Sequence, residues 1–270
     1  MSIITLLTDF GIHDEYVGLM KGVILSIVPS TVVVDITHQI DPQDIVQAAY
    51  TIKSSYHYFP TDTVHLIVVD PGVGGDRDII AVKIKRHVFI APDNGVLTLI
   101  CDEGRIESII KIDNSTLFLK SVSQTFHGRD IIAPVGAHIA KGVLLNTIGS
   151  EIGLPDIVRL KDLSATISQA GDLVGTIVSI DRFGNIITNI DSKQLNDYWR
   201  RGRNGIPQFW IGEKVVHGLS TAYINVDQQC PLAIIGSRGY LEIAVNSGSA
   251  QRYFNVNKGD TVTVTILRSR

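Results

Sequence analysis

The sequence reads Val-Val-Asp-Pro-Gly-Val-Gly-Gly-Asp-Arg from Val68 to Arg77. This stretch ends an apolar run, Val64 to Val69, that is typical of a buried strand in a parallel sheet. In open α/β sheets, ligands bind where strands end at their carboxyl edge, so Asp70 is placed to face a ligand. Arg77 is a permanent cation in the same loop and could fold back to pair with Asp70. The alternative is an ordinary turn with a surface ion pair.

The residues on both sides of this stretch alternate between strand and helix patterns. Asp41 is expected to be an N-cap, with Pro42 at the first helical position. Strand, helix, strand, helix, strand predicts a parallel sheet with crossover helices. We therefore expect an α/β N-terminal domain with a mainly parallel sheet over residues 1–152. The expected strands are 3–7, 31–36, 64–69, 79–85, 88–90 and 106–112, and the helices are 16–27, 42–52 and 131–141.

The pattern changes in the second half of the chain. Residues 153–171 carry scattered charge and little periodicity, which indicates a linker. From residue 172 onward, short strands are separated by Gly, Asn and Asp turns, which predicts a smaller all-β barrel or sandwich over 172–270. The expected strands are 173–180, 186–190, 208–211, 232–235, 240–245 and 261–267, with one helix over 191–199.

Composition excludes several classes of partner. The formal net charge is -3 and no run of Lys or Arg is present, so we expect no nucleic-acid partner. The apolar stretches are too short for a membrane span, so we expect no membrane partner. Cys101 and Cys230 lack metal or redox spacing, and so few thiols suit a cytoplasmic protein. His13, Asp14 and Glu15 are adjacent and point to different faces, so we expect no metal site.

Two further candidate residues lie in the first half of the chain. Asp9 ends the first strand, where a carboxylate can accept two hydroxyl hydrogen bonds, as ribose requires. Alternatively, Asp9 caps a helix after Gly11. His127 lies between Phe126 and Gly128, before a helix. It could act as a general base, or it could be a buried histidine with satisfied hydrogen bonds.

The second half contributes two candidate turns. Asp181, Phe183 and Asn185 share one turn, in which an aromatic face beside an amide could bind a purine. The alternative is an ordinary Asx turn with a core Phe. Ser237 and Arg238 precede a strand, and the guanidinium could bind a substrate carboxylate. The alternative is a surface Arg beside a turn.

Six motifs in this order resemble the S-adenosyl-L-methionine (SAM) hydroxide adenosyltransferases, which are SAM hydrolases related to the SAM-dependent fluorinase and chlorinase. The resemblance covers almost the whole chain. The motifs are Thr-Asp-Phe-Gly at 8–11, Val-Asp-Pro-Gly-Val-Gly at 69–74, Ala-Pro-Asp-Asn-Gly at 91–95, Phe-His-Gly-Arg-Asp at 126–130, Asp-Arg-Phe-Gly-Asn at 181–185 and Ser-Arg-Gly-Tyr-Leu at 237–241.

The resemblance implies an N-terminal α/β domain, a C-terminal β-barrel and a homotrimer. Each active site would lie between the first domain of one subunit and the second domain of a neighbour. Asp70, Arg77 and His127 would form a water-activating triad, and Asp9 would bind the ribose hydroxyls. The substrate would be SAM, and neither a cofactor nor a metal ion is expected.

The resemblance also implies roles for the second half of the chain. Asp181 and Ser237 would bind the amino-acid portion of methionine, with Arg238 at its carboxylate. Phe183 and Asn185 would contact the adenine. The spacing from Asp181 to Phe183 is one residue shorter than in the halogenating relatives, which makes the role of Asp181 the less direct carry-over.

Departures from the halogenating relatives favour hydrolysis. Those relatives carry Tyr and Thr where this chain has Asp70 and Val73, and Ser in place of Gly128. A carboxylate at Asp70 would repel a bound halide, whereas a water can donate to Asp70 and accept from Arg77. The expected reaction is therefore attack of water or hydroxide at ribose C5′, which releases adenosine and L-methionine. Either Asp70 or His127 could take the proton. A non-catalytic SAM or adenosine sensor and a SAM-dependent halogenase are the alternatives.

Overall fold

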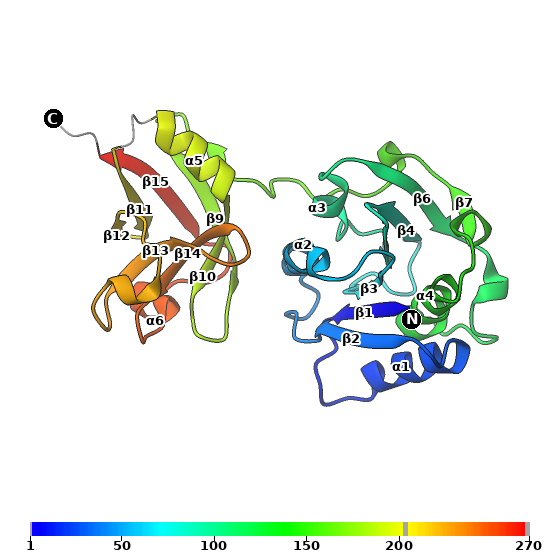
Figure 1. The fold of residues 1–270 in the computed structure, drawn as a ribbon. Coiled ribbons are helices and arrows are strands. Elements are labelled where there is room, and N and C mark those ends of the chain that lie inside the picture. Colours follow the sequence, from blue (N-terminus) through cyan, green and yellow to red (C-terminus); the bar gives the residue numbers. More distant parts are fainter. Residues whose placement is uncertain (1, 202–204, 268–270) are drawn as a thin grey trace. The chain divides into compact units, whose positions relative to one another are not determined.

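The structure, a computed structural model, describes residues 2–201 and 205–267 (Figure 1). The chain forms two compact units, Met1–Lys161 and Asp162–Arg270. The change from one unit to the other falls inside the segment 153–171. Its first part belongs to the first unit, where the main-chain N–H of Leu160 donates to the Thr98 hydroxyl at 2.9 Å. None of the described helices is long and apolar enough to span a bilayer.

The first unit is built on a seven-stranded mixed sheet in the order β2-β1-β3-β5-β4-β6-β7. Strands β2, β1, β3 and β5 are parallel, whereas the pairings of β4 with β5, β4 with β6 and β6 with β7 are antiparallel. The strands are β1 (Ile3–Thr8), β2 (Val32–Thr37), β3 (Val64–Val68), β4 (Ile79–Ile84), β5 (His87–Pro92), β6 (Ile106–Ile112) and β7 (Gly149–Glu151).

The expectation of a mainly parallel α/β sheet is thus met only in part. Lys85 and Arg86 both have positive φ, at 47° and 65°, and form a two-residue turn between β4 and β5. Such a turn joins the two strands as a hairpin, so β4 has to run antiparallel to β5. The strands beyond β4 then continue the antiparallel half of the sheet.

Helices cover both faces of this sheet. They are α1 (Tyr16–Ile27), α2 (Ile45–Ser55), α3 (Thr98–Cys101) and α4 (Ala133–Ala140). Leu66 of β3 packs in one core with Met20 of α1, while its neighbour Ile67 packs in a second core with Ile52 of α2. Successive strand residues point to opposite faces, so burial of both faces explains the continuous apolar run before Asp70.

The predicted start of the second helix is wrong. The helix begins at Ile45, and its N-cap is Asp44, whose carboxylate accepts from the Gln47 N–H at 2.8 Å. Gln43 has φ of 66°, a left-handed conformation that a helix cannot continue through. The chain therefore turns after Pro42 before the helix starts.

The second unit is an antiparallel sheet in the order β12-β11-β15-β9-β10-β14-β13, with β8 paired to β9. Its edge strands β12 and β13 are in contact, so the sheet is nearly closed and barrel-like. The strands are β8 (Thr166–Ile167), β9 (Leu173–Ile180), β10 (Ile186–Asp191), β11 (Ile206–Ile211), β12 (Lys214–His217), β13 (Pro231–Ile235), β14 (Tyr240–Val245) and β15 (Thr261–Leu267), and the helices are α5 (Ser192–Arg201) and α6 (Ala250–Phe254).

Candidate active site

Asp70 and Arg77 are paired directly after β3. The Arg77 Nε donates to both carboxylate oxygens of Asp70 at 3.0 Å, and Arg77 Nη2 also donates to Asp70 Oδ2. The side chains of Asp70 and Arg77 are 5% and 12% exposed. The loop therefore folds back on itself, and the pair is largely buried rather than a surface ion pair.

His127 completes this cluster. Its Nδ1 lies 2.9 Å from Arg77 Nη2. Because a guanidinium can only donate, Nδ1 must accept, and the proton of the neutral ring is then on Nε2. Burial, followed by the positive charge of Arg77, lowers the pKa of His127, and the ring also has a hydrogen bond with the Ser123 main chain. His127 is therefore a neutral imidazole whose Nδ1 is already engaged.

The segment before His127 is held by a buried carboxylate. Asp130 is fully buried and lies in the single π-helical turn Gly128–Ile132 that leads into α4. It accepts from the Ser123 N–H and the Ser123 hydroxyl, both at 2.8 Å, and from Arg129 Nε at 2.6 Å. Since Ser123 in turn bonds the imidazole, Asp130 helps to hold His127 in position through Ser123.

The loop of Asp70 and the loop of His127 touch at Gly74. Gly74 has φ of +80°, and a Cβ placed on it would lie 2.3 Å from the carbonyl oxygen of Gln124. Only a glycine permits this approach without displacement. This contact brings the Asp70 loop and the His127 segment together.

Asp9 lies at the same edge of the sheet. Thr8 pairs with Val68 in the parallel register, so Asp9 and Asp70 follow neighbouring strands. Asp9 Oδ2 accepts from the Gln43 N–H at 2.8 Å. The alternative that Asp9 caps the next helix is wrong, because α1 has Glu15 at its N-cap and no side-chain cap.

An aromatic cluster beside His127 was not predicted. The rings of Phe10, Tyr16 and Phe126 lie 5.2 to 5.7 Å apart between centroids, and they line a small cavity of about 380 Å³. The sequence signal was the Phe in each of the motifs 8–11 and 126–130, next to Asp9 and His127 respectively.

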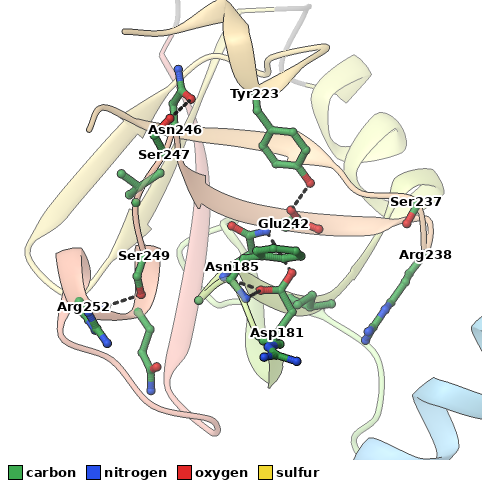
Figure 2. Close-up of a pocket in the computed structure, with 17 residues that line it drawn as sticks. Asp181, Asn185, Tyr223, Ser237, Arg238, Glu242, Asn246, Ser247, Ser249 and Arg252 are labelled. Atoms are coloured by element: carbon green, nitrogen blue, oxygen red, sulfur yellow. Dashed lines mark hydrogen bonds between the residues drawn. The ribbon is translucent and has the colours of Figure 1, made fainter. Parts of the chain in front are cut away.

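In the second unit, one cavity of about 830 Å³ collects every candidate residue of that half of the chain (Figure 2). These residues are Asp181, Phe183, Asn185, Ser237 and Arg238. The turn with Asp181, Phe183 and Asn185 follows β9, and the turn with Ser237 and Arg238 precedes β14. The two turns meet because β10 pairs with both of these strands. The alternative of a core Phe is wrong, since Phe183 is 77% exposed.

Asp181 builds its own turn. Its Oδ1 accepts from the main-chain N–H groups of Phe183 and Asn185, at 2.8 and 2.9 Å. Its Oδ2 accepts from the Asn185 side-chain amide at 3.0 Å. The alternative of an Asx turn is therefore an accurate description of Asp181, and the turn presents Phe183 to the cavity.

Two residues of this cavity were missed by sequence reasoning. Glu242 on β14 is 8% exposed, and it accepts from the Tyr223 hydroxyl at 2.6 Å. Burial raises the pKa of Glu242, and the hydrogen bond to Glu242 raises the pKa of Tyr223 to about 12. An acidic residue within the otherwise apolar segment Leu241–Val245 was the available signal for Glu242. Tyr223 lies outside the helices and strands that the sequence predicts, and no pattern indicated it.

No group of three or more His, Cys, Asp or Glu side chains that could hold a metal ion occurs among residues 2–201 and 205–267. The arrangement in the first unit can polarise a polar molecule between a carboxylate and a guanidinium. The arrangement in the second can receive a ligand with an aromatic part and charged groups.

The two units thus define a two-domain protein with a cluster of polar and charged residues in each unit that is a candidate small-molecule site. Residues 4–149 match the SAM hydroxide adenosyltransferase N-terminal domain, and residues 175–263 match the C-terminal domain. The chain belongs to the SAM hydroxide adenosyltransferase family.

Relatives match over nearly their whole length. The (R)-S-adenosyl-L-methionine hydrolase of Thermus thermophilus is 33% identical, with 94% of this chain and 95% of the relative covered. The enzyme of the same name from Methanocaldococcus jannaschii is 34% identical, with 98% and 96% covered. A fluorinase of Actinoplanes sp. is 29% identical, with 97% of each covered. Among solved structures, a Thermotoga maritima protein is 36% identical in sequence and superposes with a TM-score of 0.89. The alignment covers 97% of this chain and 99% of the Thermotoga maritima chain.

Proposed function

We propose that the protein hydrolyses SAM to adenosine and L-methionine. It is an enzyme of the SAM hydroxide adenosyltransferase family, and relatives named as SAM hydrolases share 33–34% of its residues. The observation that carries the proposal is the buried pair of Asp70 and Arg77, with His127 bonded to the guanidinium. Such a pair offers an acceptor and a donor side by side, which suits a water molecule.

In the proposed reaction, a water donates a hydrogen bond to Asp70 and accepts a hydrogen bond from Arg77. Its oxygen attacks ribose C5′ from the side opposite the sulfur. The new C–O bond forms as the C–S bond breaks, and the sulfonium takes the bonding electron pair to become the neutral thioether of methionine. The proton passes to Asp70. Alignment of the oxygen behind C5′ supplies most of the acceleration.

The hydrogen bonds of His127 support a positioning role for it in this proposal. Its Nδ1 accepts from Arg77, and the ring bonds the Ser123 main chain, so taking a proton from water would break a bond that the cluster depends on. A carboxylate has about four acceptor positions, so Asp70 retains capacity while bound to Arg77. Asp70 is therefore the proposed proton acceptor, and His127 orients the guanidinium.

The remaining residues are proposed to bind the substrate. Asp9 holds the ribose hydroxyls, and the exposed ring of Phe183 with Asn185 receives the adenine. Asp181, Ser237 and Arg238 belong to the part of the second unit that receives the methionine portion. Such a substrate needs residues of both units, and we propose a homotrimer in which neighbouring subunits complete each site.

Incubation with SAM followed by chromatography tests the reaction. We expect adenosine and methionine in equal amounts, in the presence or absence of chloride or fluoride, and with EDTA added. A 5′-halo-5′-deoxyadenosine product would support the halogenase alternative instead. Unchanged SAM that binds with a measurable Kd would support a sensor.

Subunit complementation tests the shared site. Asp70→Asn and Arg238→Ala are each expected to lose most of the activity when alone. If sites are completed between subunits, refolding the two variants together restores part of the activity, because some interfaces then combine two intact halves. Absence of restoration in a demonstrated mixed oligomer would argue that each chain forms its own site.

A further inference from the structure

A buried histidine that follows β2 reaches the loop that carries Asp9. His38 is 7% exposed, and its Nδ1 lies 2.9 Å from the hydroxyl of the fully buried Thr8. The Thr8 hydroxyl also accepts from the main-chain N–H of Phe10 at 3.2 Å. The carbonyl of His38 accepts from the N–H of Gly11 at 2.7 Å. His38 therefore holds the loop on both sides of Asp9, through its ring at Thr8 and through its main chain at Gly11.

An irregularity in the edge strand β2 accompanies this contact (Figure 1). Two successive residues of β1 pair with Asp35 and Thr37, so Ile36 is an extra residue in β2. In a regular strand, residues three apart point to opposite faces. Here Asp35 and His38 face each other instead, with 3.1 Å between Asp35 Oδ1 and His38 Nε2. Bulges redirect side chains in this way, often beside active sites.

The partners of His38 indicate how its ring is used. A carboxylate can only accept, so the proton of the neutral ring is on Nε2, toward Asp35, although the two groups are not aligned as a full hydrogen bond. Nδ1 then accepts from the Thr8 hydroxyl. Lys21 of α1 donates to the other oxygen of Asp35 at 2.6 Å. A continuous chain of contacts thus runs from α1 through Asp35 and His38 to the loop.

The Asp9 carboxylate keeps capacity for a ligand. Among the described residues it accepts one hydrogen bond, from the Gln43 N–H to Oδ2 at 2.8 Å. A carboxylate has about four acceptor positions, so two hydroxyls can still be bound. Because the aspartate side chain is short, its direction depends on where the loop holds the main chain of Asp9.

We infer that His38 is a positioning residue for Asp9. Its bonds to Thr8 and Gly11 hold the loop where the Asp9 carboxylate accepts from both ribose hydroxyls, and His38 itself does not touch the substrate. The inference rests on the proposed function, because that function makes Asp9 the residue that binds the ribose. If His38 only stabilised the fold, its loss would change stability and leave recognition of the hydroxyls intact.

The test compares adenosine with 2′,3′-dideoxyadenosine, which lacks the two ribose hydroxyls. Binding of each nucleoside to the full chain is measured by calorimetry, and neither is consumed by the proposed reaction. We expect the parent protein to bind adenosine at least about tenfold more tightly, because charge-assisted hydrogen bonds are lost with the hydroxyls. Asp9→Ala is the reference variant and is expected to reduce this preference to less than about threefold.

His38→Leu removes the bond to Thr8 and keeps a large buried side chain. We expect it to reduce the preference for adenosine to less than about threefold, while the affinity for the dideoxy analogue changes by less than about twofold. His38→Asn is the conservative variant, since its amide oxygen can take the place of Nδ1 and accept from Thr8. It is expected to keep about half or more of the parent preference.

His65 offers a matched control in the same sheet. It is fully buried, and its Nδ1 lies 2.7 Å from the hydroxyl of Thr5, which is on the same strand as Thr8. His65→Leu removes an equivalent bond within the strands instead of at the loop. We therefore expect a lower free energy of unfolding and an unchanged preference for adenosine.

Thr8→Val keeps the inference testable if His38→Leu does not fold. It removes the same bond from the other side with little change of shape, so it should also reduce the preference for adenosine. The inference is overturned if His38→Leu or a folded Thr8→Val keeps the parent preference, or if His65→Leu loses as much of it.

Turnover of SAM by the unmodified protein is assayed separately. Turnover without any preference for adenosine over the dideoxy analogue would overturn this inference and leave the proposed hydrolysis standing. The expected preferences without turnover would support this inference and overturn the proposed hydrolysis.

Discussion

The contact between Gly74 and Gln124 offers a direct test of how the site is assembled. Gly74→Ala adds a methyl group that would lie 2.3 Å from the Gln124 carbonyl oxygen. The Asp70 loop and the segment before His127 must then separate by about 1 Å, and misplacement of this size costs on the order of a hundredfold in rate. The positive φ of +80° adds about 1–2 kcal/mol of backbone strain for a residue with a Cβ.

Gly104→Ala is the matched control. Gly104 also has a positive φ, +69°, but a Cβ there would meet nothing within 4 Å. It carries the strain without the collision, so we expect a similar loss of stability and no loss of rate.

The assay is the initial rate of adenosine release at saturating SAM, with the free energy of unfolding from urea titration for each variant. We expect kcat to fall about a hundredfold in Gly74→Ala and to stay within threefold of the parent in Gly104→Ala. If Gly74→Ala kept the parent kcat, the two loops would not position the cluster through this contact. If Gly104→Ala lost as much kcat, strain alone would account for the effect.

The remaining predictions concern the cluster and two buried groups. Asp70→Asn is expected to reduce kcat about a hundredfold or more, while His127→Gln, which can still accept from Arg77, loses less than tenfold; the reverse order would make His127 the base. Burial lowers the pKa of His65 to about 3 from 6.5, so the unfolded chain binds the extra proton and stability falls as pH drops below about 6.5. In His65→Phe, the free energy of unfolding, measured by urea titration at each pH from 7 to 5, should depend less steeply on pH. The expected difference in slope corresponds to about one proton. The pKa of Glu103 is lowered to about 2, against the opposing effect of burial, by bonds from Lys53 and other neighbours. Glu103→Gln is therefore expected to lower the unfolding free energy at pH 7 by roughly 1–3 kcal/mol, and a change within 0.5 kcal/mol would contradict this.

Strands could be predicted where their buried side chains give a recognisable apolar run in the sequence. The predicted strands 173–180 and 240–245 coincide with β9 and β14, because apolar runs bounded by turn residues mark a strand from its own sequence. Strand direction depends on the connection instead. The strands 79–85 and 88–90 were predicted, but the antiparallel direction that their short connection imposes on half of the sheet was not.

The candidate site was predictable through its motifs and not through its contacts. Asp181 and Arg238 line one cavity because β10 pairs with both β9 and β14, a topology that no spacing encodes. Gly74 has to be a glycine because the carbonyl of Gln124, which is distant in the sequence, lies where a Cβ would be. The sequence shows the glycine but not this contact. Glu242 was missed because a lone acid in a strand is equally consistent with a solvent-facing position.

In the proposed mechanism, a neutral His127 also bears on why a plain carboxylate would suffice as the base. An imidazole with a free nitrogen would be a stronger base at neutral pH than an aspartate, which has an ordinary pKa near 4. Yet Arg77 donates to Nδ1, so in the proposed mechanism the imidazole orients the guanidinium instead. A positive sulfonium leaves as a neutral thioether, so the attacking oxygen needs little negative charge before the C–S bond breaks. The proposed reaction therefore depends more on the position of the attacking oxygen than on a strong base. A carboxylate bonded to a guanidinium at both oxygens is well suited to hold that oxygen in position. In the proposed site, the same carboxylate would also repel a halide, so one pair of residues would both favour water and disfavour the anion.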